Sequence, residues 1–241
     1  MPIRTFAGAL LLAGAFIQPA SAATYLITYT GTVSSGVDST GVFGTKWTNL
    51  AGNSFTVVYT LTSPQPGSET YSAGPTAYAR GGLSNGRISP VSATITIKGV
   101  TQTIDGAAFG QAYQFNDASG DSVSHVAQQY NLNETSYVNN TISSSGNNIV
   151  NSSDYTAALS YFSKADDYRS GSFQIERYYV AGNGDYIFTG LAYGNLINNS
   201  VTIAAVAAVP EPASWAMMIA GFGAVGGSLR RRSRMGAVQS A

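Results

Sequence analysis

The feature that most constrains this chain is a two-residue alternation of apolar and polar side chains. Apolar or aromatic residues alternate with serine and threonine from Tyr25 to Val33 and again from Ser54 to Thr62. The same pattern covers residues 91–98 and, more weakly, residues 173–179. Successive side chains of a strand point to opposite faces of a sheet, so each segment predicts a β-strand with one buried and one solvated face.

Short turn sequences separate these segments. They include Asn85-Gly86, Lys98-Gly99, Ser119-Gly120 and Gly182-Asn183-Gly184. Amphipathic strands joined by such turns predict a mainly β fold, a single antiparallel β-sandwich over residues 23–208, with a β-barrel as the alternative. Residues 155–162 fit either a short helix or an irregular strand, and the polar segment 139–153 predicts a long surface loop. Most of the fifteen tyrosines are expected to face inward with valine and isoleucine.

Composition excludes several classes of function. Only 10% of the residues are charged, and residues 23–209 carry seven basic and eleven acidic side chains, a net charge of about −4. A mildly acidic domain without basic clusters is not expected to bind nucleic acid, whose phosphates require lysine and arginine. The chain has no cysteine, which excludes disulfides, thiolate metal sites and a cysteine nucleophile. No cofactor is predicted.

The first 22 residues have the three parts of a secretory leader. Arg4 supplies the positive start, an apolar run follows from Phe6 to Ile17, and Ala20-Ser21-Ala22 supplies the small residues that signal peptidase accepts. We therefore predict a signal peptide over residues 1–22, cleaved so that the mature chain begins at Ala23.

An uncharged segment and a basic cluster close the other end. Residues 213–229 contain no charge, and a helix of this length spans roughly 25 Å, enough for a thin bilayer. Arg230, Arg231 and Arg232 follow directly. The positive-inside rule keeps such a cluster in the cytoplasm. The pattern predicts a transmembrane helix over 213–229, with the main domain on the far side of the membrane.

Pro210-Glu211-Pro212, then Trp215-Ala216, the apolar run and the arginines resemble the PEP-CTERM sorting signal in its PEPxxWA variant. The resemblance covers residues 209–234 and leaves 235–241 as a tail. It implies recognition by an exosortase, a membrane-embedded enzyme, with cleavage near the Pro-Glu-Pro. It further implies delivery to the surface of Gram-negative bacteria that make exopolysaccharide, which makes that polysaccharide a candidate partner.

Two motifs suggest nucleophilic chemistry but are better explained as structure. Residues 82–86 spell G-x-S-x-G, the nucleophile elbow of esterases, which requires a helix directly after the serine. Here residues 87–90 lead into an expected strand, which favours a turn. His125 is the single histidine and shares one face of an expected strand with Val123, which favours a structural hydrogen bond.

The carboxylates leave two further candidates. Asp117 and Asp121 bracket a glycine-containing turn that loosely resembles a calcium loop but lacks the D-x-D-x-D spacing and the bidentate glutamate. Asp166 and Asp167 together with Glu176 could form a glycosidase pair only at a separation that the sequence does not define.

The sequence thus predicts an exported, non-enzymatic protein of the cell surface or extracellular matrix, structural or adhesive in an exopolysaccharide context. One alternative is a glycan-binding module, in which exposed tyrosines or Trp47 form a platform beside Asp or Asn side chains. The less favoured alternative is an enzyme that acts on polysaccharide.

Overall fold

The computed structural model describes residues 22–206, 219, 221 and 222. Within residues 22–206 the chain is built almost wholly from strands. In chain order these are β1 (Ala23–Asp38), β2 (Thr48–Asn49), β3 (Ser54–Ser63), β4 (Glu69–Ala73), β5 (Thr76–Gly81), β6 (Val91–Ile97), β7 (Val100–Ile104), β8 (Phe109–Asp117), β9 (Gly120–Asn131), β10 (Glu134–Ser144), β11 (Leu159–Phe162), β12 (Tyr168–Val180) and β13 (Tyr186–Ala205). A 3-10 turn, η1 (Leu83–Asn85), lies between β5 and β6.

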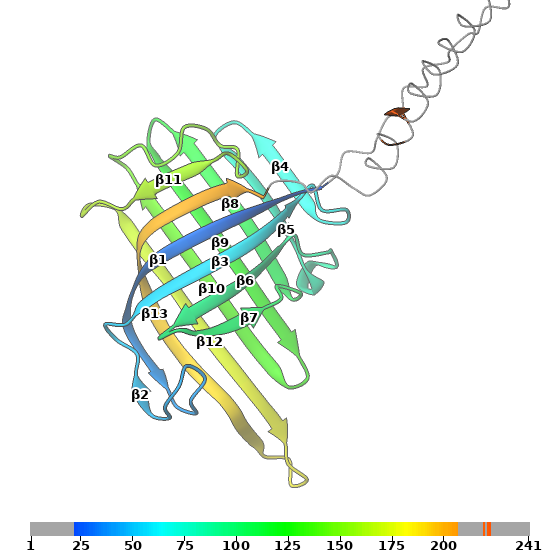
Figure 1. Ribbon diagram of the computed structural model, residues 1–241, viewed down its shortest axis with the longest axis vertical. Helices are drawn as coiled ribbons and strands as arrows, with labels where there is room; N and C mark the ends of the chain where they lie inside the picture. The colour runs from blue at the N-terminus through cyan, green and yellow to red at the C-terminus, as the bar shows by residue number, and fades with distance from the viewer. Residues whose placement is uncertain (1–21, 207–218, 220, 223–241) are drawn as a thin grey trace, which may run out of the picture.

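All strands belong to one antiparallel sheet (Figure 1). Its order is β4-β5-β8-β9-β10-β12-β13-β1-β3-β6-β7, with β2 paired to β1 and β11 paired to β13. The first and last strands of the chain, β1 and β13, are therefore neighbours near the middle of the sheet. Within residues 22–206 the order is open, because it ends at β4 on one side and at β7 on the other.

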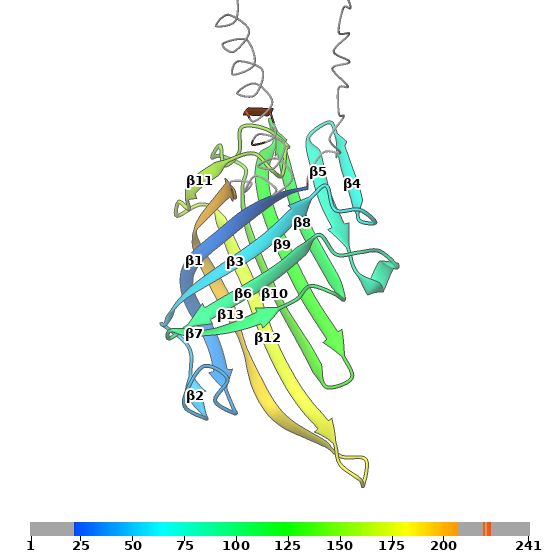
Figure 2. The same ribbon diagram turned by 45° about the vertical axis from the view of Figure 1, so that its right-hand side comes forward.

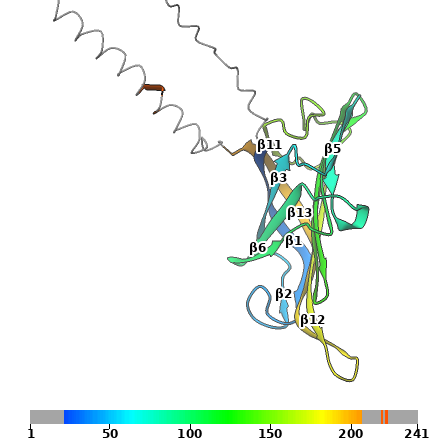
Figure 3. The ribbon, with the colours of Figure 1, turned by 90° about the vertical axis from the view of Figure 1, so that its right-hand side faces the viewer.

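The sheet curls over so that its two halves form two layers. The half that contains β3, β6 and β7 crosses in front of the half that contains β8, β9 and β10 (Figure 2), and the side view separates the layers (Figure 3). Strands β6 and β7 contact β8, β9 and β10 across the interior. The prediction of a mainly β, antiparallel fold is confirmed. The layers, however, are parts of one curled sheet, whereas a sandwich has two separate sheets.

Irregularities in the central strands accompany the curl. The pairing of β1 with β13 shifts register between Thr30 and Gly31 and again between Val33 and Ser35. The pairing of β12 with β13 shifts between Arg177 and Tyr178. Such bulges bend the strand that carries them and increase its twist, which turns the two halves of the sheet toward each other.

The core fills the space between the layers. Its largest fully buried side chains are Tyr29, Tyr59, Phe43, Phe173, Ile27, Leu50, Leu61, Ile95, Ile97, Ile104, Ile142 and Ile175. On β3 and β6 the inward positions alternate with half-buried threonine and serine, as the two-residue period predicted. The expected strands over 25–33, 54–62, 91–98 and 173–179 correspond to β1, β3, β6 and β12.

Two local predictions need correction or resolution. The expected loop over 139–153 is wrong in its first part, because β10 extends to Ser144 and buries Asn140 completely. The alternation of apolar and polar residues did not indicate this strand, because several of its inward residues are polar. The ambiguous segment 155–162 resolves in favour of a strand, β11, at its second half.

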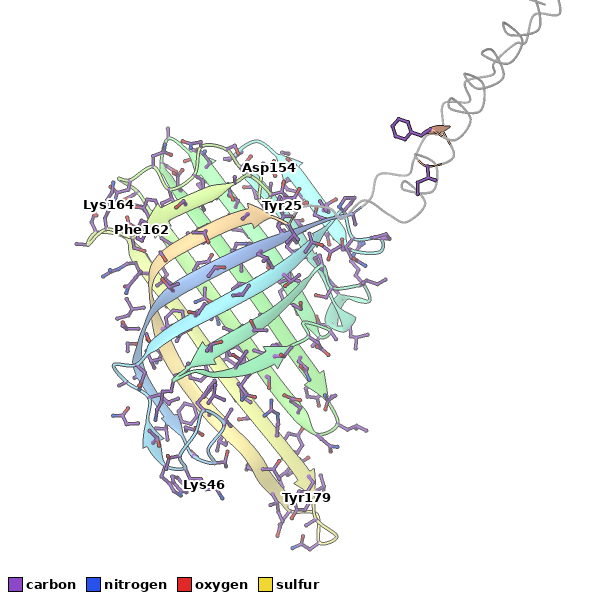
Figure 4. The ribbon with its side chains drawn as sticks, in the orientation of Figure 1. Tyr25, Lys46, Asp154, Phe162, Lys164 and Tyr179 are labelled. Carbon is purple, nitrogen blue, oxygen red and sulfur yellow. The ribbon has the colours of Figure 1, made fainter. Side chains whose placement is uncertain are left out.

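Both ends of the described domain leave it side by side. Tyr25 pairs with Ala205, and the backbone N–H of Val206 donates to the carbonyl of Thr24 at 2.8 Å. Figure 4 labels Tyr25 at this end of the molecule and Tyr179 at the opposite end, near the tip of the β12–β13 hairpin. Ala23, the predicted first residue of the mature chain, begins β1, whereas Ala20 and most of the predicted signal peptide 1–22 lie outside the described residues.

No helix in the described part of the chain is both long and apolar enough to cross a membrane. The predicted transmembrane helix 213–229 lies outside that part except for residues 219, 221 and 222, which are helical.

Candidate binding groove

An open groove of about 650 Å³ lies on the outward face of four neighbouring strands, β10, β12, β13 and β1. Its lining combines tyrosine, amide, hydroxyl and carboxylate side chains with a few apolar ones. The lining residues are Ser35, Gly36, Val37, Tyr137, Ser172, Phe173, Gln174, Glu176, Leu191, Tyr193, Gly194 and Asn195. A groove of this size with a few polar groups on a partly apolar surface is typical of a ligand site.

The register of the strands arranges the groove in rows. Tyr137 pairs with Gln174, which in turn pairs with Tyr193, so these three side chains lie on one row and one face of the sheet. Val37 pairs with Tyr193 on the far side and extends the row onto β1. Tyr193 is 49% exposed, so its ring is available to a ligand.

Polar side chains form the rows on both sides of the tyrosines. On the side of the hairpin tip, the carboxylate of Glu176 accepts a hydrogen bond from Nε2 of Gln174 at 2.6 Å. On the other side, Nδ2 of Asn195 donates to Oγ of Ser35 at 2.9 Å. Nδ2 of Asn139 donates to Oγ of Ser172 in the same row at 2.7 Å. These bonds hold the polar groups in place at the surface.

The opposite face of the same strands packs against the core, and this makes the groove floor firm. The ring of Phe173 is buried and meets that of Phe43 edge to face, with centroids 5.7 Å apart. A Cβ atom added at Gly194 would lie 2.9 Å from Cε1 of Phe173 and 2.6 Å from the carbonyl oxygen of Ser35. Only glycine allows β1, β13 and Phe173 to approach this closely.

A second polar cluster lies sealed between the layers. The hydroxyl of Tyr29 is 2.8 Å from Nδ1 of His125, and the hydroxyl of Tyr59 donates to Oδ1 of Asn140 at 2.7 Å. Nδ2 of Asn140 donates to Oδ1 of Asn198 at 2.7 Å. Burial lowers the pKa of His125 to about 3, so the ring is neutral at physiological pH. The cluster is solvent-inaccessible and acts as part of the core.

The G-x-S-x-G segment, for which the sequence favoured a turn, does not bring its serine to His125. Ser84 lies in η1, and its Oγ donates to the carbonyl of Ala108 at 2.7 Å. The turn ends at Gly86, which has a left-handed conformation. His125 instead faces Tyr29, as the structural interpretation predicted. The geometry therefore provides no Ser84–His125 pair for nucleophilic catalysis.

The candidate glycosidase carboxylates are also far apart. Asp167 precedes β12 and accepts hydrogen bonds from the hydroxyl of Tyr161 and the N–H of Lys164, both at 2.7 Å. Glu176 lies nine positions further along, roughly 30 Å of extended chain. Glycosidase carboxyl pairs require a separation of about 5–9.5 Å. The structure thus separates Glu176, which belongs to the groove, from Asp166 and Asp167.

Asp117 and Asp121 lie on either side of the β8–β9 turn and accept local hydrogen bonds there. Hydrogen bonds from the hydroxyl and the backbone N–H of Ser119 lower the pKa of Asp117. The carboxylate of Asp121 accepts from the backbone N–H of Ile149 at 2.7 Å. Among the described residues, no group of three or more histidine or acidic side chains is placed to hold a metal ion.

The tyrosine prediction was wrong for most positions. Only Tyr29, Tyr59 and Tyr161 of the fifteen tyrosines are buried. Tyr137 and Tyr193 occupy outward positions of their strands, which their polar neighbours Gln174 and Asn195 share. Their position in the two-residue alternation could have indicated that they face outward. The strand pairing that brings them together across three strands is not visible in the sequence. Trp47 is 80% exposed on the loop between β1 and β2, outside the groove lining.

The predicted sorting residues lie beyond the described domain. Pro210, Glu211, Pro212, Trp215, Ala216, Arg230, Arg231 and Arg232 are all outside the described residues. They follow β13, which ends at Ala205 beside the start of β1.

Comparison with known proteins identifies this segment. Residues 208–232 match the family model of the PEP-CTERM protein-sorting motif, and these residues include every predicted sorting residue. No curated protein and no solved structure matches the chain. The chain therefore carries the PEP-CTERM sorting motif, which implies that it is targeted by exosortase to the cell surface or extracellular space.

Proposed function

We propose that the domain is a non-enzymatic adhesive module that holds the sorted protein to extracellular polysaccharide. The observation that carries this proposal is the groove, in which a row containing two tyrosines lies between rows of hydrogen-bonding side chains. Sugar rings present C–H faces that pack on aromatic rings and hydroxyls that bond to amides and carboxylates. The resemblance of the sorting signal to those of exopolysaccharide-producing bacteria supports the same class of ligand.

The position of the groove suits a protein that is anchored at the other end. Val206, the last residue of the described domain, lies beside the start of β1. Ser35 lies twelve residues further along β1, up to ~40 Å away in extended chain. While the predicted helix 213–229 holds the chain in the inner membrane, the groove therefore remains accessible. In this proposal, signal peptidase first cleaves after Ala22, and exosortase then cleaves near Pro210 and releases the domain to the surface.

The experiment compares the full chain with a chain that lacks residues 209–241, both produced in the native host. We expect the full chain in the surface and matrix fractions, where it co-precipitates with the extracellular polysaccharide. The truncated chain should lose its surface location while its domain still binds purified polysaccharide. An unchanged location of the truncated chain would contradict the sorting mechanism, and failure of both chains to bind polysaccharide would contradict the adhesive function.

An enzymatic function predicts a different result when the purified protein is incubated with the purified polysaccharide. If the domain cleaved polysaccharide, the chain length measured by size-exclusion chromatography would fall during incubation. We expect no change in length, because the serine, histidine and paired aspartates that could act lie apart. Shortening of the polysaccharide that persists in a variant with His125, Asp166 and Asp167 all changed to Ala would point to catalytic residues elsewhere.

A further inference from the structure

The charge of the groove limits the glycans that it can accept. Glu176 is the only acidic residue of the lining, and no lysine or arginine lines the groove. The nearest basic residue in sequence, Arg177, is engaged elsewhere, with Nε 3.2 Å from Oε1 of Glu134 and an Nη2 hydrogen bond to Gln102. A uronate or sulfate group that enters the groove would therefore meet a negative charge without a compensating cation.

The spacing of the two tyrosines indicates how a chain would lie. Tyr137 and Tyr193 flank Gln174 on successive strands of the sheet, so their Cα atoms are separated by two strand spacings, roughly 10 Å. This distance is about twice the advance per sugar ring in an extended linear glycan, so the two tyrosines match alternate rings of such a chain. A chain that lies along the row, across the strands, can stack one ring on each tyrosine and direct its hydroxyls to the polar rows on either side.

From this arrangement we propose that the groove binds an uncharged stretch of a linear polysaccharide, and that Glu176 is the residue that discriminates against acidic chains. Tyr137 and Tyr193 provide the stacking surfaces. The Glu176 carboxylate accepts hydrogen bonds from sugar hydroxyls on one side, and the Asn195 and Ser35 side chains bond to hydroxyls on the other. The inference rests on the proposed adhesive function and adds the binding site, the ligand charge and the specificity residue.

The test uses one polysaccharide in two charge states. The probe is the extracellular polysaccharide of the native host together with a derivative of the same chains. If the chains are acidic, the derivative is made by reducing the carboxyl groups to alcohols. If they are neutral, it is made by oxidising the primary hydroxyls to carboxylates. Binding of the surface-recovered protein to both forms is measured by affinity electrophoresis or biolayer interferometry.

Three variants and one matched control complete the experiment. We expect Tyr193→Ala and Tyr137→Ala each to weaken binding to the neutral form by about tenfold. Glu176→Gln replaces a charged acceptor by a neutral one, so it should weaken binding to the neutral form about threefold and strengthen binding to the acidic form about fivefold. Tyr130→Ala is the control, because Tyr130 is 64% exposed on β9 and lies outside the groove lining. Its binding should equal that of the wild-type protein.

The outcomes separate this inference from the proposed function. Wild-type binding that survives in both tyrosine variants would overturn the groove as the site and leave the adhesive function intact. Tighter wild-type binding to the acidic form, or no effect of Glu176→Gln on charge preference, would overturn the discrimination by Glu176. Absence of wild-type binding to either form would overturn both proposals. Urea denaturation of each variant establishes that the fold is retained.

Discussion

The hydroxyl of Tyr29 lies 2.8 Å from Nδ1 of His125, and the two rings meet edge to face with centroids 5.6 Å apart. Both side chains are buried, and within the described residues Nε2 of His125 has no hydrogen-bond partner. The imidazole is therefore held in the core in its neutral form, and protonation would place an uncompensated charge between the layers.

This pair makes stability depend on pH. Because burial lowers the pKa of His125 from its ordinary value of 6.5 to about 3, the unfolded chain takes up a proton before the folded chain does. The free energy of unfolding should hence be unaffected by this group above pH 6.5 and fall as the pH drops toward 3, by at most about 1.4 kcal/mol per pH unit. His125→Phe should remove this slope in urea denaturation between pH 7 and 5. An identical slope in the variant would contradict the buried neutral histidine.

Asn140 links the hydroxyl of Tyr59 to Oδ1 of Asn198, two atoms that have no other side-chain partner among the described residues. Its Oδ1 accepts from the hydroxyl of Tyr59, and its Nδ2 donates to Oδ1 of Asn198, both at 2.7 Å. Asn140→Ala leaves both groups unsatisfied and should lower the free energy of unfolding by about 3 kcal/mol, whereas Tyr59→Phe should cost about 1 kcal/mol. In a double-mutant cycle the combined variant should lose about 1 kcal/mol less than the sum. Strict additivity would show that the bond contributes nothing.

Gly194 lies on the core side of the groove and has no room for a side chain. A Cβ atom there would lie 2.6 Å from the carbonyl oxygen of Ser35 and 3.1 Å from Cα of Gly36, which are backbone atoms. Gly194→Ala should therefore destabilise the domain by about 2 kcal/mol and weaken polysaccharide binding by displacing β1 from β13. Gly182→Ala is the control, because an added Cβ there meets nothing within 4 Å. Equal thermal stability of the two variants would contradict this account.

Trp47 tests whether aromatic exposure alone is enough for glycan binding. It is the most exposed aromatic side chain of the described domain at 80%, but it lies outside the groove lining. Trp47→Ala should leave polysaccharide binding within about twofold of wild type, within the scatter of surface substitutions. Loss of binding comparable to that of Tyr193→Ala would move the site to the β1–β2 loop.

The two predicted cleavages can be checked by intact mass. The protein recovered from the surface and from the medium should begin near Ala23 and end near Pro210. A mass that still includes Arg230, Arg231 and Arg232 would show that residues 213–229 are a permanent anchor. An excess over the mass of residues 23–210 would reveal a group attached during sorting.

Much of the fold could be predicted from the two-residue period, because a strand that is buried on one face has apolar residues at every second position. Strands β3 and β6 show this pattern, with apolar residues that alternate largely with threonines. β10 does not, since its inward positions include the polar residues Ser136 and Asn140. Ser136 donates to Glu134 of the same strand, and Asn140 finds its partners, Tyr59 and Asn198, on distant strands. The period also could not distinguish one curled sheet from two, because that choice depends on strand pairing.

The groove also depends on strand pairing and therefore could not be predicted from the sequence. Tyr137, Gln174 and Tyr193 are neighbours only through the pairing of β10 with β12 and of β12 with β13. The sorting motif, by contrast, is contiguous in sequence and was recognised from its own residues, and the family match confirms it.

The position of β13 has a consequence for export. This strand is the last of the domain to be made, yet it pairs with both β1 and β12 and so joins the two halves of the sheet. A chain that crosses the membrane from its N-terminal end cannot complete these pairings until residues 186–205 have emerged, directly before the sorting segment. Folding of the domain is thereby coupled to the end of translocation. A chain arrested earlier would remain in two unjoined parts, one built around β1 and β3 and the other around β10 and β12.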